Sequence, residues 1–168
     1  HYLPEEIEPH LKAHGVGISY EHPDMLDTGG GLKAARNLLG DDVVITLNPD
    51  AAWLGENPIK ALIRAWRPEM RALLLLVPMA KAATDRTSGD FSLENEEISR
   101  IGDFIYTGAQ ILHTGDLHRI PDKAFSLNRY WDLLAQDAPL NGIVYTGRWC
   151  DIGTPDGLTA AEEMLGHV

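Results

Sequence analysis

The sequence predicts an α/β fold with a mainly parallel, mixed sheet, and three features indicate it. Segments 43–47 and 72–77 are apolar throughout, which is typical of strands buried on both faces. Apolar residues at helical spacing predict a helix between them, over 59–67, for which Asn57 is a suitable cap, and a further helix is expected over 30–39. Because helices and strands alternate, right-handed crossovers between parallel strands are expected.

The chain before the first apolar strand is predicted to hold two helices and one strand. Apolar spacing predicts a helix over 3–14, which Pro9 would kink or split. Segment 17–22 is typical of a short strand. Gly40 is a suitable stop for the helix over 30–39, since glycine readily adopts the left-handed conformation that ends helices.

The second half of the chain changes character, because short strand-like segments separated by turn residues follow one another. Antiparallel strands are expected there. Ser126 is a suitable cap for one later helix, and Thr154 with Pro155 for the last. The expected strands cover 90–93, 98–101, 104–113, 142–146 and 149–153, and the expected helices cover 127–136 and 155–165.

The bulk composition suits one domain that spans 1–168. The formal net charge of −11 argues against nucleic acid as a partner, because a phosphate backbone requires a basic face. No segment has the pattern of a membrane span or a signal peptide, so no membrane partner is expected. The single cysteine, Cys150, can form no internal disulfide, and a reducing, cytoplasmic location is expected.

Three consecutive glycines, Gly29–Gly31, lead directly into the helix expected over 30–39. Glycine lets a ligand lie against the main chain, and the start of a helix adds unpaired N–H groups and the positive end of its dipole. This combination suits a nucleotide. The alternative is a plain tight turn before an ordinary helix.

Two aspartates follow apolar segments at positions where ligands commonly bind. Asp50 comes after the segment VVITLNP, and Asp151 lies within RWCDIGTP. If the fold brings them together, the two carboxylates can hold Mg²⁺, with waters and substrate phosphates completing its shell. The alternatives are a turn residue for Asp50 and a polar partner of the last helix for Asp151.

Four motifs together resemble those of the sugar-1-phosphate nucleotidyltransferases in order and spacing. They are LDTGGG, VVITLNPD, FIYTGAQIL and RWCDIGTPDGL, and the resemblance covers nearly the whole chain. The family resemblance implies a Rossmann-like α/β/α sandwich. It also implies that Thr28, Gly29 and Gly30 bind the nucleobase, that Asp50 and Asp151 are catalytic and hold Mg²⁺, and that Thr107, Gly108 and, more weakly, Asp90 contact the sugar.

The reaction that the resemblance implies is nucleotidyl transfer. A sugar 1-phosphate attacks the α-phosphorus of a nucleoside triphosphate, and pyrophosphate leaves; both substrates are the expected partners. The branch of the family that uses UTP with N-acetylmuramate 1-phosphate is the most similar. GTP with mannose 1-phosphate is one alternative, and a non-catalytic relative that binds sugar nucleotides is another. The oligomeric state stays open.

The sequence also departs from the family pattern. The family's first strand and its G-x-G-x-R loop have no counterpart, because His1 aligns after the family's second strand. A longer natural protein is expected, with a degenerate relative as the alternative, and this polypeptide is expected to be weakly active or inactive. Pro49 replaces a small residue before the metal aspartate. Lys81, Arg86 and Arg148 are candidate phosphate contacts, or merely surface charges.

Overall fold

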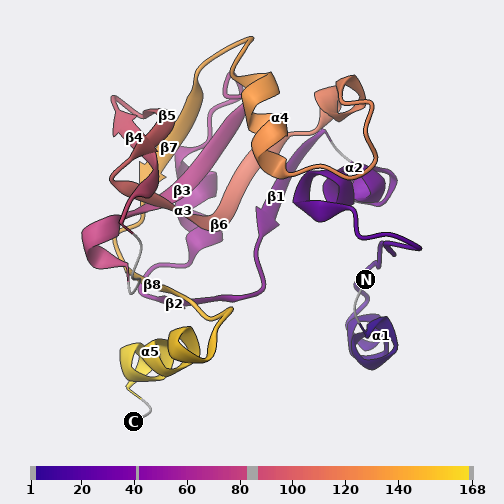
Figure 1. Ribbon diagram of the computed structural model, residues 1–168, viewed down its shortest axis with the longest axis horizontal. Coiled ribbons are helices and arrows are strands. Elements are labelled where there is room, and N and C mark those ends of the chain that lie inside the picture. Colours follow the sequence, from indigo (N-terminus) through magenta and orange to yellow (C-terminus); the bar gives the residue numbers. More distant parts are fainter. Residues whose placement is uncertain (1–2, 41, 83–86, 167–168) are drawn as a thin grey trace. The chain divides into compact units, whose positions relative to one another are not determined.

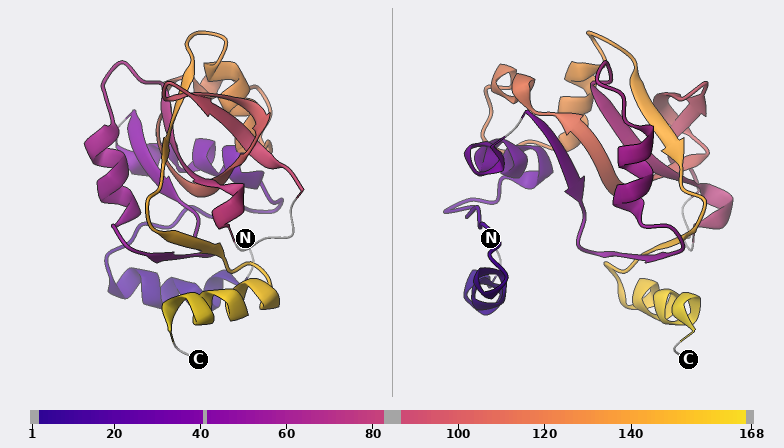
Figure 2. Two further views of the ribbon diagram at one scale, coloured as in Figure 1. Left: turned by 90° about the vertical axis from the view of Figure 1, so that its left-hand side faces the viewer. Right: turned by 180° about the vertical axis from the view of Figure 1, so that it is seen from behind.

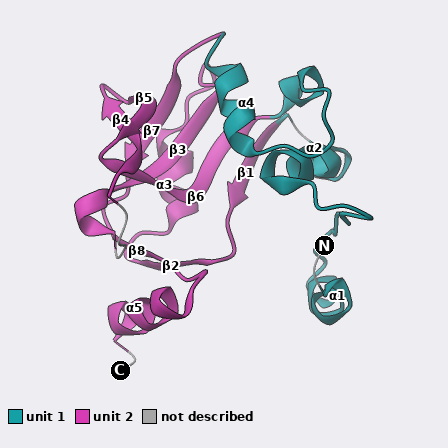
Figure 3. Ribbon diagram, in the orientation of Figure 1, with its two compact units in different colours: residues 1–42, 114–136 teal, residues 43–113, 137–168 magenta. Residues whose placement is uncertain are grey.

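The computed structural model describes residues 3–40, 42–82 and 87–166 (Figure 1). The chain divides into two compact units, which Figure 3 colours separately. One unit holds residues 1–42 and 114–136, and the other holds residues 43–113 and 137–168. No helix within the described ranges is long and apolar enough to cross a membrane. That the chain forms a single domain stays a prediction.

The first unit is helical. It holds α1 (Pro4–Ala13), α2 (Asp27–Leu39) and α4 (Leu127–Leu134), together with a short 3₁₀ helix, η2 (Gly115–Arg119). The helix α2 packs against α4. Gly40 ends α2 with φ of 71°, as predicted, and Pro9 lies inside α1, which continues past it. The strand predicted over 17–22 is wrong, since that segment has no regular structure.

The second unit is built on a mixed six-stranded sheet in the order β1-β6-β3-β7-β5-β4. A separate two-stranded ribbon pairs β2 with β8. The helix α3 packs against β3 and β6, while α5 packs against β8 and β2 on the side of the ribbon away from the sheet (Figure 2). The elements are β1 (Val43–Leu47), β2 (Ala51–Leu54), α3 (Pro58–Ala65), β3 (Ala72–Pro78), η1 (Met79–Lys81), β4 (Gly89–Glu94), β5 (Glu97–Gly102), β6 (Phe104–His113), β7 (Leu140–Val144), β8 (Arg148–Asp151) and α5 (Pro155–Leu165).

The predicted mainly parallel sheet is wrong, because most neighbouring strands are antiparallel. The strands β1, β3 and β7 do run in one direction, as the alternation of helices and strands predicts. However, β6 lies between β1 and β3 and runs against both, so β3–β7 is the parallel pair. The hairpin β4–β5 adds further antiparallel pairs, and contacts between β4 and β6 partly close the sheet.

The two apolar segments behave differently in this sheet. In β3, residues 72–77 are all at most 2% exposed, which confirms a strand buried on both faces. The same expectation for β1 is wrong, since Ile45 is 39% and Leu47 45% exposed. The cause is position: β3 has neighbours on both sides, whereas β1 stands at the edge of the described sheet beside β6. Apolar composition does not distinguish a central strand from an edge strand.

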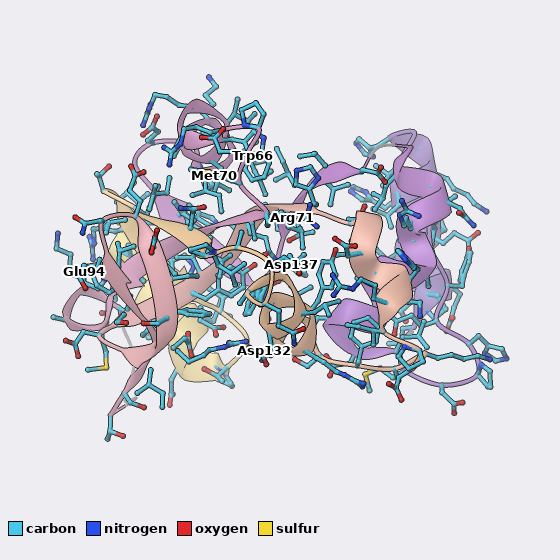
Figure 4. The ribbon with its side chains drawn as sticks, turned by 90° about the horizontal axis from the view of Figure 1, so that it is seen from above. Trp66, Met70, Arg71, Glu94, Asp132 and Asp137 are labelled. Carbon is cyan, nitrogen blue, oxygen red and sulfur yellow. The ribbon has the colours of Figure 1, made fainter. Side chains whose placement is uncertain are left out.

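The core of the second unit lies between the sheet and α3. Asn57 caps α3, as predicted, because its side chain accepts hydrogen bonds from the backbone N–H groups of Ile59 and Lys60. Leu62 of α3 and Leu75 of β3 are fully buried in the core cluster. Met70 belongs to the same cluster and Trp66 packs against it (Figure 4).

We predict that Leu75→Ala lowers the free energy of unfolding by about 2–5 kcal/mol, because it removes buried methyl groups and leaves a cavity. Urea denaturation measures the change. Ile63→Ala is the control: Ile63 is 57% exposed on α3, and its truncation is expected to change the free energy by about 0.5 kcal/mol or less. Equal effects of the two substitutions would contradict the assignment of the core.

Candidate active site

The ribbon β2–β8 brings together two aspartates that lie far apart in the sequence. Asp50 directly precedes β2, and Asp151 is the last residue of β8, where it pairs with Ala51. The backbone N–H of Ile152 donates to the carbonyl of Asp50 at 2.9 Å. The two aspartates therefore lie beside each other at one end of the antiparallel ribbon.

The two carboxylates face one small volume beside Gly153. A Cβ atom added to Gly153 would lie 3.1 Å from Oδ1 of Asp151 and 3.4 Å from Oδ2 of Asp50. The separation of these two oxygens therefore cannot exceed the sum of the two distances. The N–H of Gly153 donates to Oδ1 of Asp151 at 2.8 Å, whereas no side chain among the described residues pairs with the Asp50 carboxylate. Both aspartates are exposed to solvent.

This arrangement fits a hard divalent cation. Mg²⁺ binds carboxylate oxygens at about 2.0–2.1 Å, usually takes one or two carboxylates from the protein, and completes its shell with water and phosphate oxygens. Asp50 and Asp151 supply such a pair, and a side chain at Gly153 would fill the space between them. No group of three or more potential metal ligands occurs in the part of the chain that the structure describes. The pair therefore suits a cation shared with a phosphorylated substrate.

A bulge in β6 forms the other side of the site. Tyr106 pairs with Leu76 and Gln110 with Leu74, so three residues of β6, 107–109, lie opposite the single residue Leu75 of β3. Gly108 has φ of 86°, which favours glycine. Its carbonyl accepts the N–H of Asn48 at 2.9 Å, and a Cβ atom on Gly108 would lie 2.7 Å from Cβ of Asn48. The bulge thus allows β6 to approach the segment that leads to Asp50.

Thr107 uses its polar groups inside the protein. Its hydroxyl donates to the carbonyl of Leu75 at 2.7 Å, and its carbonyl accepts the indole N–H of Trp149 at 3.1 Å. The residue is 1% exposed. The predicted sugar contact from Thr107 and Gly108 therefore rests on their backbone, and it stays a prediction.

A small pocket unites these features within the second unit. Asp50, Asp151, Thr107 and Gly108, four of the predicted site residues, all line it. Tyr106 and Trp149 were not among the predicted site residues, although both lie within the motifs FIYTGAQIL and RWCDIGTPDGL. The complete lining is Asn48, Asp50, Ala51, Ile105, Tyr106, Thr107, Gly108, Trp149 and Asp151.

A hydrogen bond joins Tyr106 of β6 to Asp90 of β4. Burial raises the pKa of the Tyr106 phenol, which hydrogen-bonds to Thr46 and stays neutral at physiological pH. The N–H of Tyr106 donates to Oδ2 of Asp90 at 2.9 Å. Through this bond the Asp90 carboxylate supports the backbone of β6 beside the pocket. Asp90 itself is not among the described residues that line the pocket. Its predicted contact with the sugar stays a prediction.

The glycine segment lies in the helical unit, inside the first turn of α2. The N–H groups of Gly29 and Gly30 both donate to the carbonyl of Phe125 at 3.0 Å, and the N–H of Thr28 donates to Oδ1 of Asp27 at 2.5 Å. The expectation that these N–H groups are bare is therefore wrong in this conformation. The role of Thr28, Gly29 and Gly30 in binding a nucleobase stays a prediction.

The same glycines are required for close packing. A Cβ atom on Gly29 would lie 2.5 Å from the ring of Phe125, and one on Gly30 would lie 2.2 Å from the carbonyl of Lys123. Segment 123–125 therefore lies directly on the helix start, where a larger residue would clash. Close packing of segment 123–125 therefore accounts for the glycines at positions 29 and 30 as well as a ligand site would.

The remaining candidates are placed as follows. Arg148 donates to the carbonyl of Met164 at 3.4 Å, and Lys81 ends the short helix η1. Neither is among the described residues that line the pocket, and Arg86 lies outside the described residues.

Cys150 is 1% exposed, and burial, with the nearby Asp151 charge, raises the pKa of its thiol. The thiol donates to the carbonyl of Gly157 at 3.3 Å, as expected of a packed side chain.

Solved structures identify the class of fold. A putative glucose-1-phosphate thymidylyltransferase from Bacillus anthracis matches with a TM-score of 0.74 and 15% identity, over 99% of this chain and 73% of that one. The HddC protein from Yersinia pseudotuberculosis, in complex with GMP-PN, matches with a TM-score of 0.75 and 20% identity, over 98% and 75%. The inositol-1-phosphate CTP transferase from T. maritima matches with a TM-score of 0.74 and 15% identity, over 98% and 73%. The chain therefore has the α/β fold of nucleotidyltransferases.

A sequence relative identifies the family. No family model matches the chain. The chain is 32% identical to N-acetylmuramate alpha-1-phosphate uridylyltransferase from Caulobacter vibrioides over 183 aligned positions, which cover 99% of this chain and 76% of the relative. The chain belongs to the sugar-1-phosphate nucleotidyltransferase family, which confirms the resemblance seen in its motifs.

We predict that Gly108→Ala destabilises the protein by about 1–3 kcal/mol, because alanine is strained at positive φ and its Cβ would press on Asn48. Urea denaturation measures the loss. Gly17→Ala is the matched control: no atom lies within 4 Å of the added Cβ, and its φ is not positive. The control is expected to leave stability unchanged or slightly raised. An equally mild effect at Gly108 would argue against the bulge geometry.

Proposed function

We propose that the protein transfers uridine monophosphate from UTP to N-acetylmuramate 1-phosphate with release of pyrophosphate. The observation that carries the proposal is the pair of carboxylates, Asp50 and Asp151, that faces one volume beside Gly153. The identity of 32% with a relative of that named activity supports the choice of substrates. Membership of the sugar-1-phosphate nucleotidyltransferase family does not depend on this choice, because it follows from the same relative.

The reaction needs alignment and charge neutralisation more than a strong base. A phosphate oxygen of the sugar 1-phosphate is already a nucleophile; it forms a bond to the α-phosphorus of UTP as the bond from that phosphorus to the bridging oxygen of pyrophosphate breaks. Asp50 and Asp151 would hold Mg²⁺, which when bound supplies positive charge beside the phosphates. Without it, the two aspartates would repel both substrates.

We propose roles for the other predicted site residues as well. The bulge at Thr107 and Gly108 would present its backbone to the sugar, next to the carboxylates. Tyr106 also lines the pocket, while its phenol is buried and hydrogen-bonded to Thr46. We propose separately that Thr28, Gly29 and Gly30, which belong to the helical unit, bind the nucleobase.

The proposal predicts Mg²⁺-dependent release of pyrophosphate by the natural polypeptide that contains this sequence, with UTP and N-acetylmuramate 1-phosphate preferred in a panel that includes GTP and mannose 1-phosphate. Asp50→Asn and Asp151→Asn are each expected to lower kcat/KM at least ~100-fold, because each removes charge that neutralises and positions the cation. Gly153→Ala is expected to act similarly without a change of charge, since its methyl group enters the space between the carboxylates.

Asp156→Asn is the matched control. It removes a carboxylate from the exposed first turn of α5, five residues after Asp151, and is expected to leave kcat/KM unchanged. Thermal unfolding verifies that every variant is folded. Full activity in both Asp50→Asn and Asp151→Asn would refute the assigned site, and preference for GTP with mannose 1-phosphate would replace the proposed substrates. A lack of turnover with every pair would favour a non-catalytic relative that binds sugar nucleotides.

A further inference from the structure

The two halves of the pocket belong to different sheets. Asp50 and Asp151 lie at the end of the ribbon β2–β8, whereas Thr107 and Gly108 lie in β6 of the six-stranded sheet. No backbone ladder joins the ribbon to the sheet within the described residues. Their relative position at the pocket therefore depends on the short connection 48–50 between β1 and β2 and on individual contacts.

Two hydrogen bonds reach consecutive carbonyls of the β6 bulge. The backbone N–H of Asn48, which leads to Asp50, donates to Gly108 at 2.9 Å. The indole N–H of Trp149, two residues before Asp151, donates to Thr107 at 3.1 Å. One bond thus holds each aspartate-bearing segment against the bulge, and the bond from Trp149 is made by a side chain.

The bond from Trp149 is shielded from water. Trp149 is 7% exposed and Thr107 is 1% exposed. A buried carbonyl that loses its donor is destabilised, so the indole and the bulge are expected to stay together in the folded state. The aromatic rings of the ribbon also pack on the core of the second unit.

Trp53 provides a natural comparison. It lies directly opposite Trp149 in the ribbon register. Its ring packs edge-on against Tyr145, with a centroid distance of 5.1 Å and an interplanar angle of 87°. Among the described residues, nothing accepts a hydrogen bond from its indole. Two tryptophans thus share one ribbon, and only the N–H of Trp149 reaches the bulge.

We propose that Trp149 is a positioning residue whose indole N–H sets the distance between the carboxylate pair and the bulge. The inference rests on the proposed function. In that reaction a cation held at the end of the ribbon must contact the phosphate of a sugar bound beside the bulge, so the distance between ribbon and bulge matters. Since both carboxylates are carried by the ribbon, loss of the bond leaves the cation ligands together. It disturbs the alignment of the sugar 1-phosphate with them.

The test compares Trp149→Phe with Trp53→Phe in the natural polypeptide. Trp149→Phe keeps an aromatic ring and removes the N–H donor. It is expected to lower kcat/KM for the sugar 1-phosphate by about 10- to 100-fold, since misplacement of about 1 Å can have such an effect. The affinity for Mn²⁺ in the absence of substrates, measured by electron paramagnetic resonance, is expected to stay unchanged. Trp53→Phe is expected to leave both quantities unchanged.

A second substitution separates the hydrogen bond from ring size. Benzothienylalanine at position 149 retains the shape of the indole and replaces its N–H by sulfur, and it is expected to reproduce the loss seen with phenylalanine. Equal kcat/KM in the Trp149 and Trp53 variants would overturn the proposal, as would a parallel loss of Mn²⁺ affinity, which would indicate collapse of the ribbon. If the wild-type protein shows no turnover with any substrate pair, the proposed function fails and this inference fails with it.

Discussion

The site depends on one constraint, the antiparallel pairing of β2 with β8. That pairing places Asp151 opposite Ala51, and it lets the N–H of Ile152 donate to the carbonyl of Asp50. Two carboxylates that would otherwise repel each other are thereby held at one end of a short ribbon, where a divalent cation relieves the repulsion. Gly153 leaves the space between them open, because it has no side chain.

The larger sheet completes the site through an irregularity in its own structure. The bulge in β6 opposite Leu75 turns the hydroxyl of Thr107 inward and presents the carbonyls of Thr107 and Gly108 to the ribbon segments. A regular strand would offer those groups to its neighbours in the ladder. The buried strand β3 supports the bulge from behind, since residues 72–77 are enclosed by the core. The well-packed strand β3 thus supports the irregular segment of β6 that lines the proposed site.

Local features were predictable from the sequence, and long-range neighbours were not. The caps Asn57 and Thr154 and the buried strand β3 follow from short-range chemistry, and the motif residues Asp50 and Asp151 converge as the family resemblance implies. The insertion of β6 between β1 and β3 depends on pairing between distant segments, which an apolar run does not encode. Likewise, the glycines in the first turn of α2 gave no sign that the carbonyl of Phe125 accepts the N–H groups of Gly29 and Gly30.

The central claim is that Asp50 and Asp151 act as one cation site, and a double-mutant cycle of Mn²⁺ binding tests it most directly. Electron paramagnetic resonance titrations would compare the wild-type protein with Asp50→Asn, Asp151→Asn and the double variant. A shared ion predicts that either single substitution weakens binding at least about tenfold, and that the double variant binds little worse than either single one. Unchanged affinity in either single variant, or a separate ion that each single variant retains and only the double variant loses, would contradict the account.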